Sequence, residues 1–134
     1  MRFLTPTYIC SLFGSSFQHQ IVLDSVSIDG EPINPYAGCD MLTHIVFFRF
    51  PSSDIANQAK AKLLSMAGKI PALKSIEVGI DIVRSQRSWD LALLTRFADK
   101  SGLEEYSVNP IHQEVLLFLR EHAIEVAAVD YISD

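Results

Sequence analysis

Apolar and polar residues alternate along three segments of the chain, and this period of two is typical of β-strands in a sheet. The first segment, residues 42–50, is rich in β-branched and aromatic side chains that fall on both faces. One face carries Leu42, His44, Val46, Phe48 and Phe50, and the other carries Ile45 and Phe47. Apolar residues on both faces predict a central strand.

The second and third segments predict two further strands, over residues 73–83 and 89–97. The apolar face of the second segment consists of Ile76, Val78, Ile80 and Ile82. The corresponding side of the third segment consists of Trp89, Leu91, Leu93, Thr95 and Phe97. Residues 124–132 complete the pattern as a last strand.

Helical patterns lie between these strands. Residues 52–71 predict a helix, since a serine or aspartate at positions 52–54 can cap its start and Gly68 and Pro71 can end it. Residues 98–107 predict a short helical piece. Asn109 as N-cap and Pro110 as first helical residue predict another helix, which extends to residue 122.

The order of these elements, β-α-β-β-α-β, predicts an α+β domain of the ferredoxin-like type. Helices that cover one face of a four-stranded sheet leave the other face bare. Because the strands carry apolar residues on both faces, the bare face needs a partner. We therefore expect a homodimer in which two sheets pack together.

The first 40 residues have a different character. Residues 27–40 read "SIDGEPINPYAGCD", with two prolines and two glycines, which is typical of loops and linkers. We expect residues 1–40 to be an N-terminal extension that is irregular or poorly ordered, and residues 41–134 to form the domain. Cys10 and Cys39 both fall in this extension, and without a disulfide framework they are expected to be free thiols in the cytoplasm.

The amino-acid composition argues against two classes of partner, nucleic acids and membranes. Hydrophobic residues make up 49% of the 134, enough for a core, and the net charge is −5. A negative surface is repelled by phosphate backbones, so we expect no nucleic-acid partner. No apolar run is long enough to span a bilayer, so no membrane partner is expected.

His112 is the first candidate for chemistry, because it lies in the first turn of a helix among apolar neighbours. The partial positive charge of a helix N-terminus and partial burial both disfavour the imidazolium form. We expect His112 to be neutral near pH 7 and able to accept a proton as a general base. The structural alternative is an imidazole that bonds a buried carbonyl and only packs.

His44 and Tyr106 are the other two candidates. His44 lies among apolar residues on the expected central strand and needs a polar partner, which Tyr106 or His112 could supply. The Tyr106 hydroxyl could stabilise an enolate oxygen, or the ring could only cover the edge of the core. The histidines lack a nearby carboxylate triad, since Glu114 and Glu121 are expected to be solvated, and no nucleotide-binding fingerprint occurs, so neither a metal nor a cofactor is expected.

Four stretches taken in order carry a more specific pattern: "MLTHIVFFRF", "KIPALKSIEVGIDI", "YSVNPIHQEVLLFL" and "VAAVDYI". Together they resemble the stress-responsive dimeric α/β-barrel family, often called Dabb, over nearly all of residues 41–134. The resemblance implies a homodimer whose two sheets form a barrel. It also implies a pocket between sheet and helices.

Some plant members of that family are polyketide cyclases, which close a linear polyketide by aldol condensation without metal or organic cofactor. Their strand His, Tyr and His after Pro match His44, Tyr106 and His112, so the resemblance implies a catalytic role for these three. The lysine that precedes the strand His in such cyclases is replaced here by Thr43.

Three functions are therefore open. The first is a stress-responsive homodimer that binds a small apolar or aromatic molecule without turnover. The alternative is a cofactor-independent enzyme of the cyclase, isomerase or lyase type with His112 as general base. A third is a purely structural dimer that protects or scaffolds other proteins.

Overall fold

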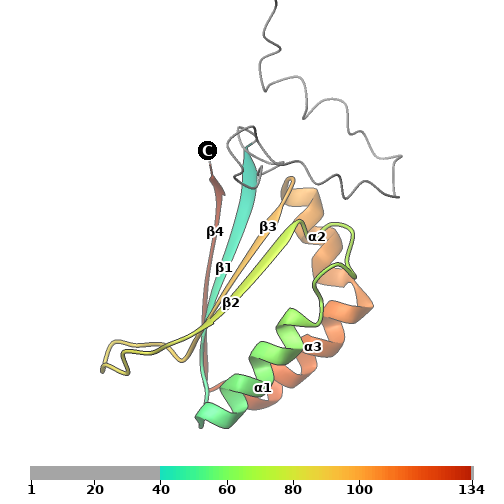
Figure 1. Cartoon of the computed structure of the whole chain (residues 1–134). Helices are drawn as coiled ribbons and strands as arrows, with labels where there is room; N and C mark the ends of the chain where they lie inside the picture. The colour runs from blue at the N-terminus through green and yellow to red at the C-terminus, as the bar shows by residue number, and fades with distance from the viewer. Residues whose placement is uncertain (1–39, 134) are drawn as a thin grey trace, which may run out of the picture. The chain divides into compact units, whose positions relative to one another are not determined.

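A computed structural model of the chain describes residues 40–133, as Figure 1 shows. In chain order the elements are β1 (Met41–Arg49), α1 (Ser53–Leu64), β2 (Ser75–Ile80), β3 (Leu91–Phe97), α2 (Lys100–Val108), α3 (Pro110–His122) and β4 (Glu125–Ser133). The expected N-terminal extension and both cysteines lie outside the described residues, with the exception of Asp40.

The strands form one antiparallel sheet with the order β2-β3-β1-β4, so the fold is ferredoxin-like as predicted. β1 pairs with β3 on one side and with β4 on the other, which confirms the predicted central strand, although it begins at Met41 and ends at Arg49, before Phe50. β2 and β4 are the edge strands of this sheet.

Each helix begins after a capping residue whose side chain accepts a hydrogen bond from a backbone amide of the first turn, an amide that has no partner within the helix. Ser52 caps α1 and Asn109 caps α3, with Pro110 in the first turn of α3. α1 ends earlier than expected, at Leu64, and the chain then turns through Gly68. Gly68 adopts a φ of 71°, a left-handed conformation that glycine reaches without strain.

All three helices pack on the same face of the sheet, which we call the helix side (Figure 1). Cross-strand partners share a face, so Val46 and its β3 partner Leu93 both point to the helix side. Fully or almost fully buried residues of this core include Phe48, Ala56, Ala59, Leu63, Met66, Leu91, Leu93 and Phe97. The hydrophobic core is therefore completed within one copy of the chain.

The opposite face of the sheet, the open face, carries apolar side chains that the described part of the chain leaves partly bare. Phe47 is 36% exposed, Val129 49% and Tyr131 44%. The strand register places these three on the same side as Ile45 and Leu94. A contiguous apolar surface of this kind is typical of an interaction site.

Two expectations about single residues were wrong. Ile82 does not share the buried face of Ile76 and Val78, because β2 ends at Ile80 and Ile82 is 92% exposed. Trp89 precedes β3 and contacts Phe47 of the open face, at 6.3 Å between ring centroids. Alternation thus holds within the strands and fails just beyond their ends.

Candidate functional site

Tyr106 and His112 lie in direct contact at the junction between α2 and α3. Their ring centroids are 4.1 Å apart and the ring planes are inclined by 39°. The junction is short because Asn109 ends α2 and caps α3, so Tyr106 in the last turn of one helix faces His112 in the first turn of the next. The predicted pair is therefore brought together by a single helix–helix corner.

The hydrogen bond of His112 fixes which of its ring nitrogens is free. Nδ1 lies 3.2 Å from the carbonyl oxygen of Ser107. A carbonyl can only accept, so Nδ1 must donate its proton. In the neutral ring the other nitrogen, Nε2, then carries the lone pair and is able to accept a proton.

The pKa of His112 is lowered from its ordinary value of 6.5, and burial is the main cause because it penalises the charged ring. The bond to the Ser107 carbonyl acts in the opposite direction, and positive charge on His44 and Arg120 lowers the pKa further. His112 is thus neutral near pH 7, in agreement with the direction expected from the sequence.

Tyr106 is almost completely buried, with 2% of its surface exposed. Its ring also packs on Phe97, at 5.0 Å between centroids. Burial raises the pKa of the phenol well above its usual range, so Tyr106 keeps its proton and remains a hydrogen-bond donor. Among residues 40–133, no side chain is hydrogen-bonded to this hydroxyl.

His44 forms a hydrogen-bonded ion pair with Asp130, which lies directly opposite on β4. This corrects the expectation that Tyr106 or His112 would be its partner. The Asp130 carboxylate accepts the hydrogen bond that Nδ1 of His44 donates, so Nε2 is the ring nitrogen outside this pair. Side-chain exposure is 19% for His44 and 48% for Asp130, so the pair lies at the margin of the core.

The helix side of the sheet thus gathers four side chains from four elements, which we call the imidazole cluster: His44, Tyr106, His112 and Asp130. The contacts within this cluster form two pairs, His44 with Asp130 and Tyr106 with His112. Sequence reasoning missed Asp130. The available signal was a carboxylate inside a mostly apolar last strand, whose other carboxylate, Glu125, stands at its start, but pairing Asp130 with His44 required the strand register.

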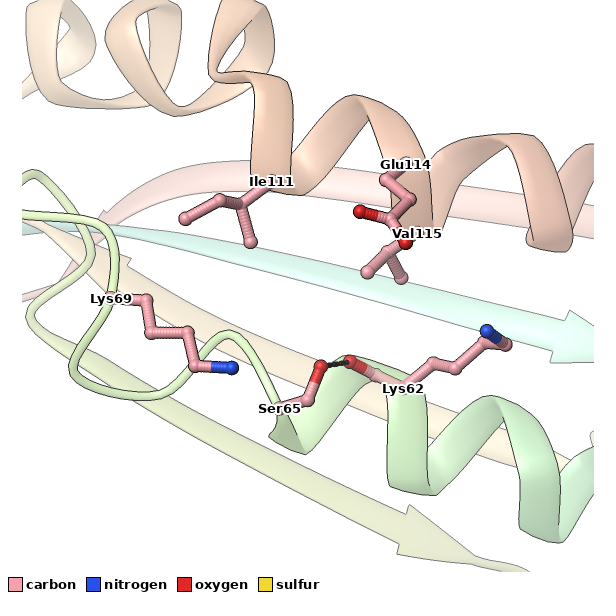
Figure 2. A pocket seen from close by; sticks show the side chains of 6 residues that line it. All are labelled: Lys62, Ser65, Lys69, Ile111, Glu114 and Val115. Carbon is pink, nitrogen blue, oxygen red and sulfur yellow. Dashed lines mark hydrogen bonds between the residues drawn. The ribbon is translucent and has the colours of Figure 1, made fainter.

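A hollow of about 300 Å³ lies between α1 and α3, away from the cluster. Figure 2 shows its walls, with lysines from the α1 side and apolar side chains from α3. The lining residues are Lys62, Ser65, Lys69, Ile111, Glu114 and Val115. The expected pocket between sheet and helices is not this hollow, because none of the three predicted catalytic residues lines it.

A second hollow, of about 280 Å³, opens on the open face beside Trp89. Its lining residues are Phe47, Gly79, Ile80, Asp81, Trp89, Leu91 and Ala92. It too is separate from the imidazole cluster. A ligand cavity at the cluster itself therefore stays a prediction.

Further observations concern metal binding, the remaining described histidine and the length of the helices. Within residues 40–133, no three His, Cys, Asp or Glu side chains come together as a metal site. His122 bonds the carbonyl of Phe118 at 2.9 Å and stacks on its ring, so it belongs to the end of α3 and not to the cluster. No helix in the described range is long and apolar enough to cross a bilayer.

Comparison with known proteins gives one family and a set of solved structures. The family model described as "Stress responsive A/B Barrel Domain" matches residues 42–133. No curated protein matches the chain by sequence.

Two of the similar solved structures are described as dimeric ferredoxin-like proteins of unknown function. The one from Bacteroides fragilis is 26% identical with a TM-score of 0.61, over 68% of this chain and 94% of its own. The one from Jannaschia is 27% identical with a TM-score of 0.58, over 68% and 97%. A hydroxynitrile lyase from Passiflora edulis shares the fold at 18% identity and a TM-score of 0.63, over 71% and 94%.

Proposed function

This chain belongs to the family of stress-responsive A/B barrel domains, and from that premise we propose that it is a homodimer that binds a small apolar or aromatic molecule at the imidazole cluster. The observation that carries the proposal is the contact between Tyr106 and His112, in a position where burial lowers the pKa of the imidazole. Sites for small molecules typically combine apolar walls with a few placed polar groups.

The dimer is supported by the open face and by the relatives. Phe47, Val129 and Tyr131 leave apolar surface on the open face of the sheet. The relatives from Bacteroides fragilis and Jannaschia are described as dimeric. Two copies that pack these faces together would bury the apolar surface and form the barrel that the family is named for.

The ligand class follows from the groups around the imidazole cluster. The surroundings of the cluster are apolar, since the buried rings of Tyr106 and Phe97 pack together beside it and Leu42 lies two residues before His44 on the same face of β1. Nε2 of the neutral His112 ring can accept one hydrogen bond. A molecule with an aromatic or aliphatic body and a hydroxyl group matches this combination.

Native mass spectrometry of the purified protein tests the binding proposal, since it reports both the oligomer and any retained molecule. We expect a dimer that carries a small apolar or aromatic compound. His112→Gln should lose that compound while His122→Gln, at the far end of the same helix, keeps it. A dimer that retains no molecule, and whose melting temperature no aromatic or polyketide-like compound raises, would leave only the structural, scaffolding role.

The second candidate is a cofactor-independent enzyme of the cyclase or isomerase type, and the protonation states of the cluster favour it. A neutral His112 with a free Nε2 can take a proton from carbon next to a carbonyl group. The Tyr106 hydroxyl can donate to the oxygen on which negative charge then develops. Asp130 would hold the ring of His44 in one tautomer and orientation.

In this mechanism the proton removed from carbon resides on Nε2 of His112 until it is returned to the product. No electrons are transferred to an external acceptor, so the cycle is balanced without a cofactor. A positioned base contributes about 10²–10⁴-fold to rate. That the Passiflora edulis structure is described as a hydroxynitrile lyase supports the idea that this fold can host an enzyme.

Turnover on polyketide-like, enolisable and hydroxynitrile compounds separates the two candidates. The enzyme proposal expects turnover that His112→Gln reduces by about 10²-fold or more at unchanged melting temperature. His122→Gln should retain the full rate. Binding without turnover on every class would favour the first candidate.

We keep the cytoplasm as the compartment, a prediction that rests on the two cysteines and the absence of a disulfide framework in the sequence. A fluorescent fusion to the C-terminus of the full chain tests it. Diffuse cytoplasmic signal is expected, and secretion into the medium would contradict it.

A further inference from the structure

The segment between β2 and β3, residues 81–90, projects beyond the ends of the strands and away from the helices (Figure 1). We call this segment the arm. Two adjacent apolar residues on it are bare, since Ile82 is 92% exposed and Val83 is 74% exposed. Single exposed apolar residues are common, but two adjacent β-branched residues on a projecting segment form a contact surface.

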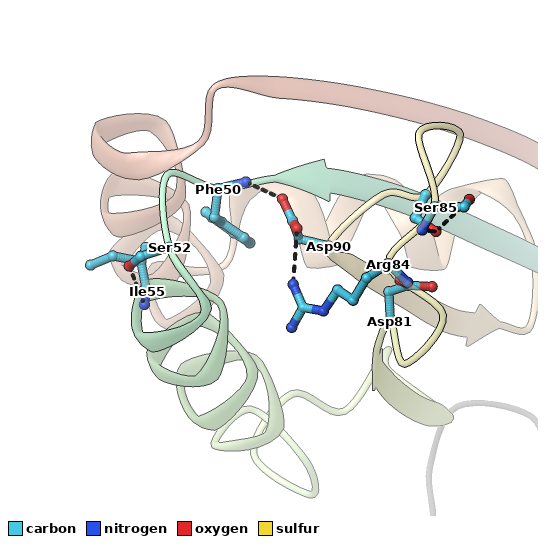
Figure 3. Close-up of polar contacts among 8 residues, drawn as sticks. Phe50, Ser52, Ile55, Asp81, Arg84, Ser85 and Asp90 are labelled. Carbon is cyan, nitrogen blue, oxygen red and sulfur yellow. Dashed lines mark hydrogen bonds and ion pairs between the residues drawn. The ribbon is translucent and has the colours of Figure 1, made fainter.

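The arm is held in one conformation by polar contacts, as Figure 3 shows. The Asp81 carboxylate accepts a hydrogen bond from the backbone amide of Arg84 at 2.6 Å. The Ser88 hydroxyl accepts one from the backbone amide of Ser85 at 3.0 Å. Asp90 accepts the amide of Phe50 at 2.8 Å and pairs with Arg84 at 3.5 Å. The base of the arm is therefore anchored to the end of β1.

Arg84 adopts a φ of 56°, the left-handed region that costs a residue with a Cβ about 1 kcal/mol. Such a conformation persists only where surrounding contacts determine it, and it occurs often where a segment engages a partner. A segment built to present its apolar pair in a fixed position has little ordering entropy left to lose on binding.

The second hollow lies next to the base of this arm, on the open face. Its volume of about 280 Å³ exceeds that of one branched aliphatic side chain, and Phe47, Trp89 and Ala92 give it apolar walls. Gly79 lines it without a side chain, and a Cβ built there meets nothing within 4 Å. The open face thus carries an apolar projection and an apolar recess close together.

A projection and a recess on one surface are what a two-fold interface requires. In such an interface, residue i of one copy contacts residue j of the other, and residue j contacts residue i in return. We propose that in the homodimer the arm of each copy places Ile82 and Val83 in the Trp89 hollow of the other copy. This inference rests on the proposed homodimer and specifies how its two subunits clasp.

Photo-crosslinking in mixed-isotope dimers tests the clasp directly. A benzophenone amino acid replaces Ile82 in the full chain, and unlabelled and ¹⁵N-labelled copies are mixed before irradiation. Crosslinks should join a light copy to a heavy one, at peptides that contain Gly79 or Trp89. The same probe at Leu117, which is 65% exposed on α3, should give no crosslink between copies.

Two outcomes would overturn the proposal, and they separate it from the dimer on which it rests. Crosslinks from position 82 confined to one copy, in a protein that scatters light as a dimer, would reject the clasp and leave the dimer standing. A protein that scatters light as a monomer would reject both.

Two variants test the same contact between subunits, one by changing the arm and the other by changing the hollow. Ile82→Ser with Val83→Ser removes the projection, and Gly79→Val fills the recess from within a strand that accepts β-branched residues. Each should weaken dimerisation about 10-fold or more, because a two-fold interface loses the contact twice. Val108→Ser, which is 75% exposed at the end of α2, is the matched control. Unchanged dimer affinity in both variants would contradict the clasp.

Discussion

Phe47 and Phe48 are neighbours in the chain, yet they belong to two different kinds of surface. Phe48 points to the helix side of β1 and is 4% exposed, whereas Phe47 points to the open face and is 36% exposed. Around Phe48 the helix side is covered by elements of the same chain, whereas the open face around Phe47 is not. The comparison shows that this sequence encodes one apolar surface that its own helices cover and another that they leave partly exposed.

The two faces also differ in their chemistry along β4. Asp130 joins His44 on the helix side, where the polar cluster lies at the edge of the core. Val129 and Tyr131 occupy the open face one residue away on either side. One strand therefore contributes a carboxylate to a candidate site and apolar surface to a candidate interface.

Truncation of Phe47 and of Phe48 to alanine should give the largest difference in stability between the two faces. Phe48→Ala leaves a cavity in the core of the helix side and should lower the free energy of unfolding by about 3–5 kcal/mol. Phe47→Ala removes a ring that is partly exposed in one copy and should cost about 1 kcal/mol in the protomer. Urea unfolding at a protein concentration low enough for the protomers to be separate measures both, and equal losses there would contradict two unlike faces.

A charge on the open face should separate the subunits. Val129→Glu places a carboxylate where a second copy is expected to pack, and an unpaired buried charge is strongly destabilising. Dimer affinity should fall about 100-fold or more, as measured by light scattering over a dilution series. Val126→Glu is the matched control, since Val126 is 57% exposed on the helix side of the same strand. Equal behaviour of the two variants would place the interface elsewhere.

Removal of the Asp130 carboxylate should disturb the imidazole cluster with a modest cost to the fold. Asp130→Ala should lower the free energy of unfolding by about 1 kcal/mol, because the pair is partly exposed. Nitrogen NMR should show that neutral His44 no longer keeps its proton on Nδ1. Glu125→Ala, which removes the carboxylate paired with Arg49 on the same strand, is the control and should leave the tautomer of His44 unchanged.

Acid should weaken the protein through His112, and this is the smallest effect expected. The folded ring has a pKa below its ordinary value of 6.5, so the unfolded chain takes up a proton first as the pH falls. Stability should therefore decline below about pH 6.5 until the folded pKa is passed, and then level off. Unfolding of His112→Gln and His122→Gln at neutral and mildly acid pH measures this, and only the former should lose part of the decline.

Most of the fold could be predicted from the sequence because its signals are local. Alternation gave the strands, and Ser52 and Asn109 gave the helix starts through capping that depends on a few adjacent residues. The errors arose at strand ends. Ile82 and Trp89 continue the alternation in sequence, but the arm interrupts the strands, and nothing local marks where pairing stops.

The site was only half predictable for a related reason. His44, Tyr106 and His112 attract notice as polar or aromatic groups in apolar surroundings. The pairing of His44 with Asp130 depends on the register between β1 and β4, which lie far apart in the chain. The bond from His112 to Ser107 depends on the angle between α2 and α3, which no periodicity reports.

Sedimentation equilibrium of the unmodified chain at micromolar concentration tests most directly whether a second copy covers the open face. The account predicts a particle of twice the chain mass of 15.0 kDa. A folded particle of 15.0 kDa that does not associate as the concentration rises would contradict it.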